Sequence, residues 1–187
     1  MRTFKLQVQT TVDGYMAGPN GEMGWMQFPW TADVGAYINA MTSKVDLIVL
    51  GRKLAEGFIP AWQAGPPGEP QHAIDFMNNT PKVVVSNSLT ESTWDNATVA
   101  GGDLAGTINQ LKAEGGGDMI AYGGSTLVSD LIAQQLLDEL HLFVNPNAIG
   151  TGKPVFADTG TKQKLSLVKA TPFECGIVAL HYGPRRD

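Results

Sequence analysis

The clearest chemical feature of the sequence is a candidate phosphate-binding element in the segment MIAYGGSTLVSD. Its apolar run Met119–Tyr122 predicts a buried parallel strand, and Ser125 offers a hydroxyl cap to the amphipathic helix that follows. Gly123 and Gly124 lie at the junction, where the lack of a Cβ lets an anion reach the free N–H groups of the helix. A pyrophosphate is the expected ligand, although a Gly-Gly pair also serves simply to turn the chain.

A second element of the same kind lies in the segment LIVLGRK, where an apolar strand runs into Gly51 and Arg52 begins a helix. Ligands of open α/β sheets bind outside the carboxyl ends of the strands. The two glycine-containing junctions are therefore expected on the same side of one sheet, spanned by an adenine dinucleotide. The β-branched strand Lys82–Ser86 ends in Ser86, Asn87 and Ser88, which we expect near an adenosine ribose.

The aromatic segment GPNGEMGWMQFPW, residues 18–30, is the candidate wall of a substrate pocket. Trp25, Phe28 and Trp30 suit stacking on a planar heterocycle. The alternative is that these side chains anchor the loop onto the apolar core. Both interpretations remain open on the sequence alone.

Asp33 is the candidate proton source, because it lies in the first turn of a helix that Thr31 is predicted to cap. A carboxylate there could contact a substrate or supply a proton beside a nicotinamide. The alternative role is structural, since an acidic residue in a first turn is stabilised by the helix dipole.

Composition excludes several classes of function. The 187 residues carry a formal net charge of −5, which disfavours a nucleic-acid partner. Cys175 is the only cysteine, so disulfides within the chain and cysteine-rich zinc sites are excluded, and a reducing cytoplasm is expected. The start of the sequence lacks the apolar region of a signal peptide, and no apolar run is long enough to span a membrane. The three histidines share no ligand spacing, and no metal site is expected.

Strand and helix patterns alternate along the chain, which predicts a single α/β domain over residues 1–187. A short helix is predicted after Gly51 with its end near Gly57, followed by an extended Pro/Gly loop over Ile59–Pro70. The last two strands, near Leu165–Ala170 and Ile177–Tyr182, have no helix between them. They are therefore expected to be antiparallel neighbours in a mixed, mostly parallel sheet with helices on both faces.

Five segments together resemble the dihydrofolate-reductase-like superfamily, and within it the stand-alone relatives of the reductase domain of riboflavin-biosynthesis deaminase/reductases. These segments are TTVDGYMAGPNG, VLGRK, KVVVS, AYGGSTLVSDLI and LLDELHLFVNPNAIGTGKPVF, in this order along the chain. The resemblance implies a three-layer fold, NADPH across the carboxyl ends of the strands, hydride transfer to a pyrimidine-like or pterin-like heterocycle, and a homodimer. NADH is not excluded as the cofactor.

The resemblance also implies roles for individual residues. Asp13, Trp25, Trp30 and the neighbouring Asp33 would face the substrate. The residues expected to line the cofactor are Gly51, Arg52, Lys53, Ser86, Asn87, Gly123, Gly124, Ser125 and Thr126.

Three positions depart from the pattern of the riboflavin-pathway reductases. Tyr15 replaces a basic residue, Tyr122 replaces a glutamate, and Asn87 stands where arginine is frequent in the superfamily. The deaminase part is absent, because its zinc chemistry needs cysteines that this chain lacks. Two alternatives therefore accompany the reductase hypothesis: true dihydrofolate reductase activity, and a nucleotide-binding module without catalysis.

Overall fold

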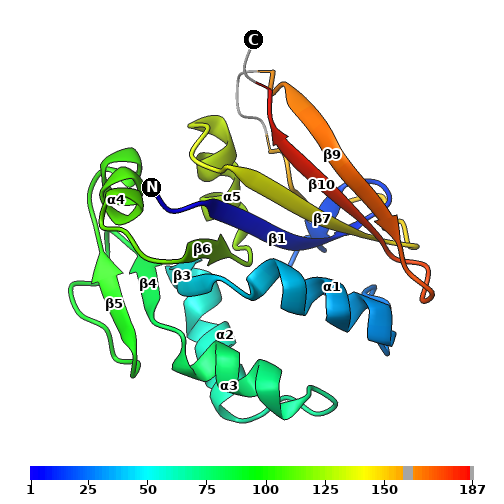
Figure 1. The fold of residues 1–187 in the computed structure, drawn as a ribbon, viewed down its shortest axis with the longest axis horizontal. Coiled ribbons are helices and arrows are strands. Elements are labelled where there is room, and N and C mark those ends of the chain that lie inside the picture. The colour runs from blue at the N-terminus through cyan, green and yellow to red at the C-terminus, as the bar shows by residue number, and fades with distance from the viewer. Residues whose placement is uncertain (158–161, 186–187) are drawn as a thin grey trace.

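Eight strands form one central sheet, with helices on both of its faces (Figure 1). The computed structural model describes residues 1–157 and 162–185. The strands of this sheet are β1 (Phe4–Thr11), β3 (Val45–Gly51), β4 (Lys82–Val85), β5 (Ala97–Ala100), β6 (Asp118–Ala121), β7 (Glu139–Asn145), β9 (Leu165–Pro172) and β10 (Val178–Pro184). The helices are α1 (Ala32–Thr42), α2 (Arg52–Gln63), α3 (Gln71–Asn79), α4 (Leu104–Ala113) and α5 (Ser125–Ala133).

The strand order is β5-β4-β3-β6-β1-β7-β10-β9. All neighbours from β5 to β7 are parallel, whereas β10 is antiparallel to both β7 and β9. The predicted mixed, mostly parallel sheet with antiparallel carboxyl-terminal strands is therefore confirmed. Because six strands run in one direction, their carboxyl ends meet at a single edge, which we call the carboxyl edge.

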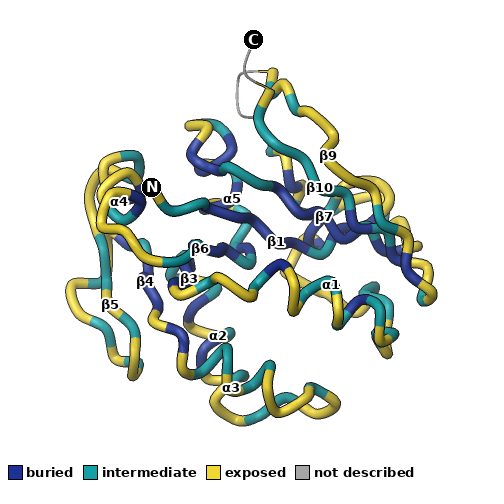
Figure 2. The backbone as a smooth tube through the Cα atoms, in the orientation of Figure 1, coloured by how far each residue is buried: buried dark blue, intermediate teal, exposed yellow. Residues whose placement is uncertain are grey.

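Alternation along β3 shows how the sheet builds two apolar layers. Val49 belongs to the cluster that includes Ile108 of α4, whereas Ile48 belongs to the cluster that includes Ile59 of α2. Successive side chains of a strand point to opposite faces, so α4 and α5 cover one face, and α2 and α3 cover the other. Each fully buried side chain of this kind contributes about 1.5–3 kcal/mol. Figure 2 shows the buried residues concentrated in the central strands.

The face of β1 that lies under α1 is polar. Phe4, Leu6 and Val8 belong to the apolar cluster, but Lys5 and Gln7 point to the other face, and both are buried. The Lys5 ammonium group donates to the carbonyl of Met41 at the end of α1 (2.9 Å) and pairs with Asp118 (2.8 Å). Polar contacts, as well as apolar packing, therefore hold α1 against this part of the sheet.

Helix α2 is longer than the sequence predicts. It continues past Gly57 and through Pro60 to Gln63, so the predicted loop over Ile59–Pro70 is wrong in its first part. Tertiary packing overrides the two poor helix formers. Ile59 is buried, and Phe58 stacks on Tyr122 with ring centroids 5.7 Å apart.

A second, two-stranded sheet was not expected from the sequence. It pairs β2 (Tyr15–Ala17) with β8 (Lys153–Pro154) in an antiparallel arrangement. Both strands are too short to give a periodic signal. The pairing holds the segment after β1 against the chain that follows β7.

Replacing Gly57 with alanine should stabilise the protein by about 0.5–1 kcal/mol, because this residue lies exposed inside α2. A Cβ at this position meets nothing within 4 Å. Urea unfolding of Gly57→Ala measures the gain. Gly117→Ala is the contrasting variant, since its Cβ would overlap the carbonyl oxygen of Lys44 and should destabilise the fold. A Gly57→Ala protein less stable than the parent would contradict the helical assignment.

Candidate functional site

The junction between β6 and α5 has an uncapped helix start. The N-cap position of α5 is occupied by Gly124, which has no side chain that could accept a hydrogen bond. Gly124 has a φ of 86°, and Gly123 before it has a φ of 135°. The predicted capping role of Ser125 is therefore wrong, because Ser125 is the first helical residue and no side chain caps the helix. Glycine takes these backbone angles without steric cost. The first-turn N–H groups of α5 consequently receive no acceptor from a cap side chain.

The start of α2 adjoins the start of α5. A Cβ on Gly51 would lie 3.3 Å from the Cβ of Leu127, and a Cβ on Gly124 would lie 3.6 Å from the Cβ of Leu54. The helix that begins after β3 therefore touches the helix that begins after β6, as the two glycine-containing junctions predict. Like α5, α2 has no side-chain cap, since Gly51 is its cap residue.

We call the adjoining starts of α2 and α5, with Gly51, Gly123 and Gly124, the glycine corner. The electrostatic character of this corner is positive. Neither α2 nor α5 has an acidic residue in its first turn, so the positive ends of both helix dipoles are uncompensated there. Arg52 is the first residue of α2 and forms an ion pair with Glu56 one turn later, whereas Lys53 is exposed. Ser125 is half-buried and Thr126 is exposed in the first turn of α5. Such an arrangement can bind a phosphate group.

The end of β4 is organised by its own side chains. The Ser86 hydroxyl oxygen accepts hydrogen bonds from the N–H groups of Ser88 (3.1 Å) and Leu89 (3.0 Å). The Asn87 side-chain oxygen accepts from the N–H of Gly102 (2.7 Å), beyond the end of β5. These bonds fix the loops after β4 and β5 beside the start of α2, and a cofactor-binding role of the two side chains stays a prediction.

The aromatic loop, residues 18–30, is held at the carboxyl edge by two asparagines. Asn145 is the last residue of β7, and Asn147 lies two residues beyond it. The buried Asn145 accepts from the N–H of Gln27 (2.8 Å) and donates to Gln9 (2.8 Å). Asn147 donates to the carbonyl of Trp25 (2.8 Å). The loop therefore lies across the ends of β1 and β7.

The tryptophans of this loop are partly buried. Trp30 stacks on Phe28, with ring centroids 5.4 Å apart, and packs against the apolar cluster around Phe143. Within the described part of the chain, the indole N–H groups of Trp25 and Trp30 are buried and have no hydrogen-bond partner. Trp30 therefore anchors the loop onto the core, as the alternative interpretation expects, while both rings keep an unused donor.

Asp13 is an ordered, ionised carboxylate between β1 and β2. Its oxygens accept hydrogen bonds from the N–H groups of Ile149 (3.1 Å) and Gly150 (2.7 Å). A hydrogen bond from the Thr11 side chain, followed by that of Gly150, lowers the pKa of Asp13. The carboxylate thus ties the turn after β1 to the loop after β7, next to the predicted substrate region.

Asp33 links the start of α1 to the turn between β9 and β10. Its carboxylate accepts from the Thr31 hydroxyl, from the N–H of Val34 (3.0 Å) and from the N–H of Glu174 (3.0 Å). The Thr31 hydrogen bond is the main cause of a lowered pKa, followed by that of Glu174. Thr31 precedes α1 as predicted, but it makes no side-chain cap bond. The geometry favours an anionic anchor, and proton donation by Asp33 stays a prediction.

Sequence reasoning missed two apolar residues of the glycine corner. The Cε methyl group of Met16 would lie 3.5 Å from a Cβ on Gly123, and Leu54 lies against both glycines. Met16 belongs to the unexpected strand β2, which explains why no periodic signal pointed to it. The residues of β2 therefore lie between the glycines at the start of α5 and the aromatic loop.

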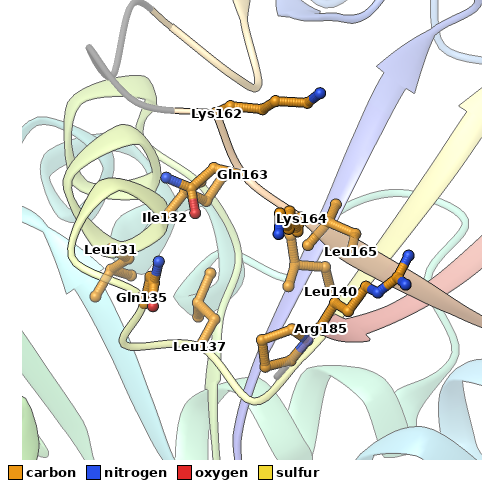
Figure 3. Close-up of a pocket in the computed structure, with 11 residues that line it drawn as sticks. Leu131, Ile132, Gln135, Leu137, Leu140, Lys162, Gln163, Lys164, Leu165 and Arg185 are labelled. Carbon is orange, nitrogen blue, oxygen red and sulfur yellow. The ribbon is translucent and has the colours of Figure 1, made fainter. Parts of the chain in front are cut away.

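A separate pocket of about 260 Å³ lies at the opposite end of α5 (Figure 3). It is lined by Leu131 in the last turn of α5, by Gln135 just beyond that helix, by Leu140 of β7, and by Lys164 and Arg185. None of the sequence-predicted site residues lines it. The pocket is therefore distinct from the carboxyl edge.

Comparison with known proteins decides the family. Residues 2–179 match the model of the RibD C-terminal domain. The chain belongs to the RibD C-terminal domain family. This confirms the predicted resemblance to the reductase domain of riboflavin biosynthesis. No helix within the described ranges is long and apolar enough to cross a membrane.

Three relatives illustrate the relationship. The uncharacterized protein YyaP of Bacillus subtilis (strain 168) is 29% identical over 185 residues, which are 97% of this chain and 94% of YyaP. A putative riboflavin biosynthesis protein from Shewanella sp. PV-4 has a TM-score of 0.79 at 22% identity, with 100% of both chains covered. Dihydrofolate reductase from Enterococcus faecalis, solved with NADP(H), has a TM-score of 0.64 at 15% identity, covering 98% of this chain and 97% of that chain. These neighbours confirm the dihydrofolate-reductase-like fold.

The lowered pKa of Asp33 predicts a pH-dependent contribution to stability. Its folded-state pKa lies below the unfolded value of about 3.9, so its contribution is present above that pH and is lost as pH falls through the folded pKa. Asp33→Asn should therefore be less stable than the parent at pH 7, and the difference should shrink below about pH 4. Urea unfolding over a pH series measures it. Asp130→Asn controls for the loss of one exposed negative charge, and a difference that stays constant with pH would contradict the assignment.

Proposed function

We propose that this chain is an NADPH-dependent reductase that transfers a hydride to a small pyrimidine-like or pterin-like heterocycle. The observation that carries the proposal is the contact between the uncapped starts of α2 and α5 at Gly51 and Gly124. Two sets of free first-turn N–H groups at one edge of a parallel sheet suit a ligand with a diphosphate.

The residues of the corner fit a nicotinamide dinucleotide. Gly123 and Gly124 leave the backbone accessible because they carry no side chain, and their φ angles of 135° and 86° disfavour other residues there. The first-turn amides of Ser125 and Thr126 would bind phosphate oxygens, with Arg52 and Lys53 as nearby cations at the start of α2. Only the cofactor's nicotinamide would supply the hydride, so the protein has to position the ring and exclude water.

The loop over residues 18–30 would form the substrate side. Trp25 and Trp30 each keep a buried indole N–H without a protein partner within the described ranges, which a polar heterocycle or an ordered water could satisfy. Asp13 and Asp33 place two ionised carboxylates in the segments that flank this loop. A carboxylate there would accept hydrogen bonds from the N–H groups of a heterocycle rather than deliver a proton at neutral pH.

The relatives support the reaction class. The family is named after the carboxyl-terminal part of a riboflavin-biosynthesis protein, and the Shewanella structure is described as a putative protein of the same pathway. The Enterococcus reductase carries NADP(H) on the same fold. A reaction like that of 5-amino-6-(5-phosphoribosylamino)uracil reductase is therefore the first to test. Tyr15 stands where those reductases carry a basic residue, which favours a substrate without a phosphorylated ribose.

Activity measurements distinguish the proposed reductase from a dihydrofolate reductase and from a nucleotide-binding module without catalysis. A panel with dihydrofolate, pterins and aminopyrimidines, monitored by NADPH oxidation, identifies the acceptor. Methotrexate-sensitive turnover of dihydrofolate would establish dihydrofolate reductase activity instead. Binding of NADPH without turnover of any member of the panel would favour a nucleotide-binding module.

Changing Thr126 to glutamate should weaken NADPH binding at least about tenfold, because it puts a like charge beside the expected phosphates. Thr126 is exposed in the first turn of α5, where a carboxylate gains about 0.3–1 kcal/mol from the dipole, so folding should be retained. Fluorescence titration with NADPH and NADH measures affinity. Thr126→Gln controls for side-chain size. Equal NADPH affinity of Thr126→Glu and the parent would exclude the glycine corner as the binding site.

We also propose a homodimer formed through β9. This edge strand is exposed along most of its length, and Leu167 (56%) and Val168 (61%) are among the most exposed large apolar residues. An exposed apolar edge strand invites pairing with another chain. Sedimentation equilibrium should give twice the monomer mass for the parent and the monomer mass for Leu167→Lys. A monomeric parent would refute the proposal.

A further inference from the structure

Three side chains on the sheet face under α1 form a cluster of possible metal ligands that no sequence pattern indicates. They are Glu139 and His141 of β7 and His181 of β10. Among the described residues, one donor atom from each of these side chains lies within 4.8 Å of the other two. We propose that this Glu139–His141–His181 cluster binds a divalent transition-metal ion, with zinc as the best match to its ligands.

Strand pairing brings the cluster together. His141 and His181 are directly opposite each other in the antiparallel ladder of β7 and β10, so both side chains point to the same face. Glu139 lies two residues before His141 on the same strand and therefore on that face. The two imidazole rings stack with centroids 4.2 Å apart. Forty residues of sequence separate the histidines, and only the register of β10 makes them neighbours.

The distances suit a small ion. Glu139 Oε2 lies 2.9 Å from His141 Nε2 and 3.7 Å from His181 Nε2. Ligands of a tetrahedral zinc ion at 2.0–2.1 Å are separated by about 3.3 Å, so modest side-chain rotations would bring all three atoms to one centre. Two histidines and one glutamate are an established zinc-ligand set that leaves a fourth position to water. The side chain of Glu139 is 30% exposed, which gives water and the ion access.

Partners around the cluster support metal binding. The Tyr37 hydroxyl lies 3.0 Å from His141 Nδ1, and a hydrogen bond at this nitrogen orients a histidine whose Nε2 binds a metal. His181 Nε2 is buried and has no hydrogen-bond partner within the described ranges. Gln7 of β1 is buried and stands directly opposite His141 of β7. Its Oε1 atom also has no hydrogen-bond partner within the described ranges. Unused buried polar atoms at such a position leave hydrogen-bonding capacity that a bound ion and its water can use.

Positive charge near the cluster is compensated. Lys5 is the paired neighbour of Glu139 on β1, but its ammonium group forms an ion pair with Asp118 at 2.8 Å and donates to the carbonyl of Met41. Lys169 is opposite His181 on the edge strand β9 and is exposed. The Glu139 carboxylate therefore remains available as an anionic ligand.

The ion would have a structural role. Glu139 is the first residue of β7, whereas Asn145, which holds the aromatic loop, is the last. The cluster thus lies at the end of β7 remote from the carboxyl edge. A bound ion would cross-link β7 to β10 beneath α1, and it would act independently of the proposed nucleotide site.

Isothermal titration of the tag-free chain with Zn²⁺ tests the proposal. One Zn²⁺ should bind per chain, and His141→Gln and His181→Gln should each weaken binding about 100-fold or more. His72→Gln is the matched control, because His72 lies on α3 outside the cluster and its loss should leave the affinity unchanged. Tyr37→Phe should weaken binding about 10–100-fold, as loss of a hydrogen bond to a metal-binding histidine does.

A Co²⁺ titration of the unaltered chain keeps the test independent of how the variants fold. Visible absorption typical of a four-coordinate Co²⁺ complex should saturate at one equivalent and disappear on addition of Zn²⁺. No Zn²⁺ binding, or equal affinity in the parent and in folded His181→Gln, would overturn the proposal. NADPH affinity should be the same with and without Zn²⁺, so failure of one site does not affect the conclusion about the other.

Discussion

The site depends on one constraint: two helices begin at neighbouring strand ends, and neither receives a side-chain cap. Their first-turn N–H groups need acceptors from outside the helices. Gly51 allows this close approach, because a Cβ there would lie 3.3 Å from the Cβ of Leu127, and Gly124 takes a φ of 86° that other residues rarely adopt. The central parallel strands hold this corner rigidly, since their side chains are buried on both faces. A phosphate-bearing ligand would complete the hydrogen bonding that the protein leaves open.

Long periodic segments of the fold could be predicted from sequence. The apolar runs that predict strands before Gly51 and before Gly123 correspond to β3 and β6, and the last two predicted strands correspond to β9 and β10. Single-residue signals gave wrong helix ends where tertiary packing or backbone geometry determines the end of the helix. Gly57 and Pro60 predicted the end of a helix that the burial of Ile59 extends. At the start of α5, the serine hydroxyl suggested a cap, but the N-cap position has a φ of 86°, which favours glycine.

The candidate site was predictable at its glycines but not at its other contacts. Gly51 and Gly124 follow strands whose pattern indicates parallel neighbours, so their proximity could be deduced from topology. The roles of Asn145 and Met16 could not, because they depend on how the aromatic loop and the three-residue strand β2 fold back onto the edge. The histidine pair shows the same limit. Spacing along the chain carries no information about His141 and His181, which meet only through the register of two antiparallel strands.

The position of β1 has a consequence for how the chain folds. This first strand lies in the middle of the sheet, where Phe4 pairs with Met119 and Lys5 pairs with Glu139. During synthesis its edges stay unpaired until most of the chain has left the ribosome. Contacts between segments so distant in sequence slow folding, and unpaired strands expose nascent chains to aggregation. Truncated products of this chain would consequently be targets for chaperones and proteases, rather than partly active fragments.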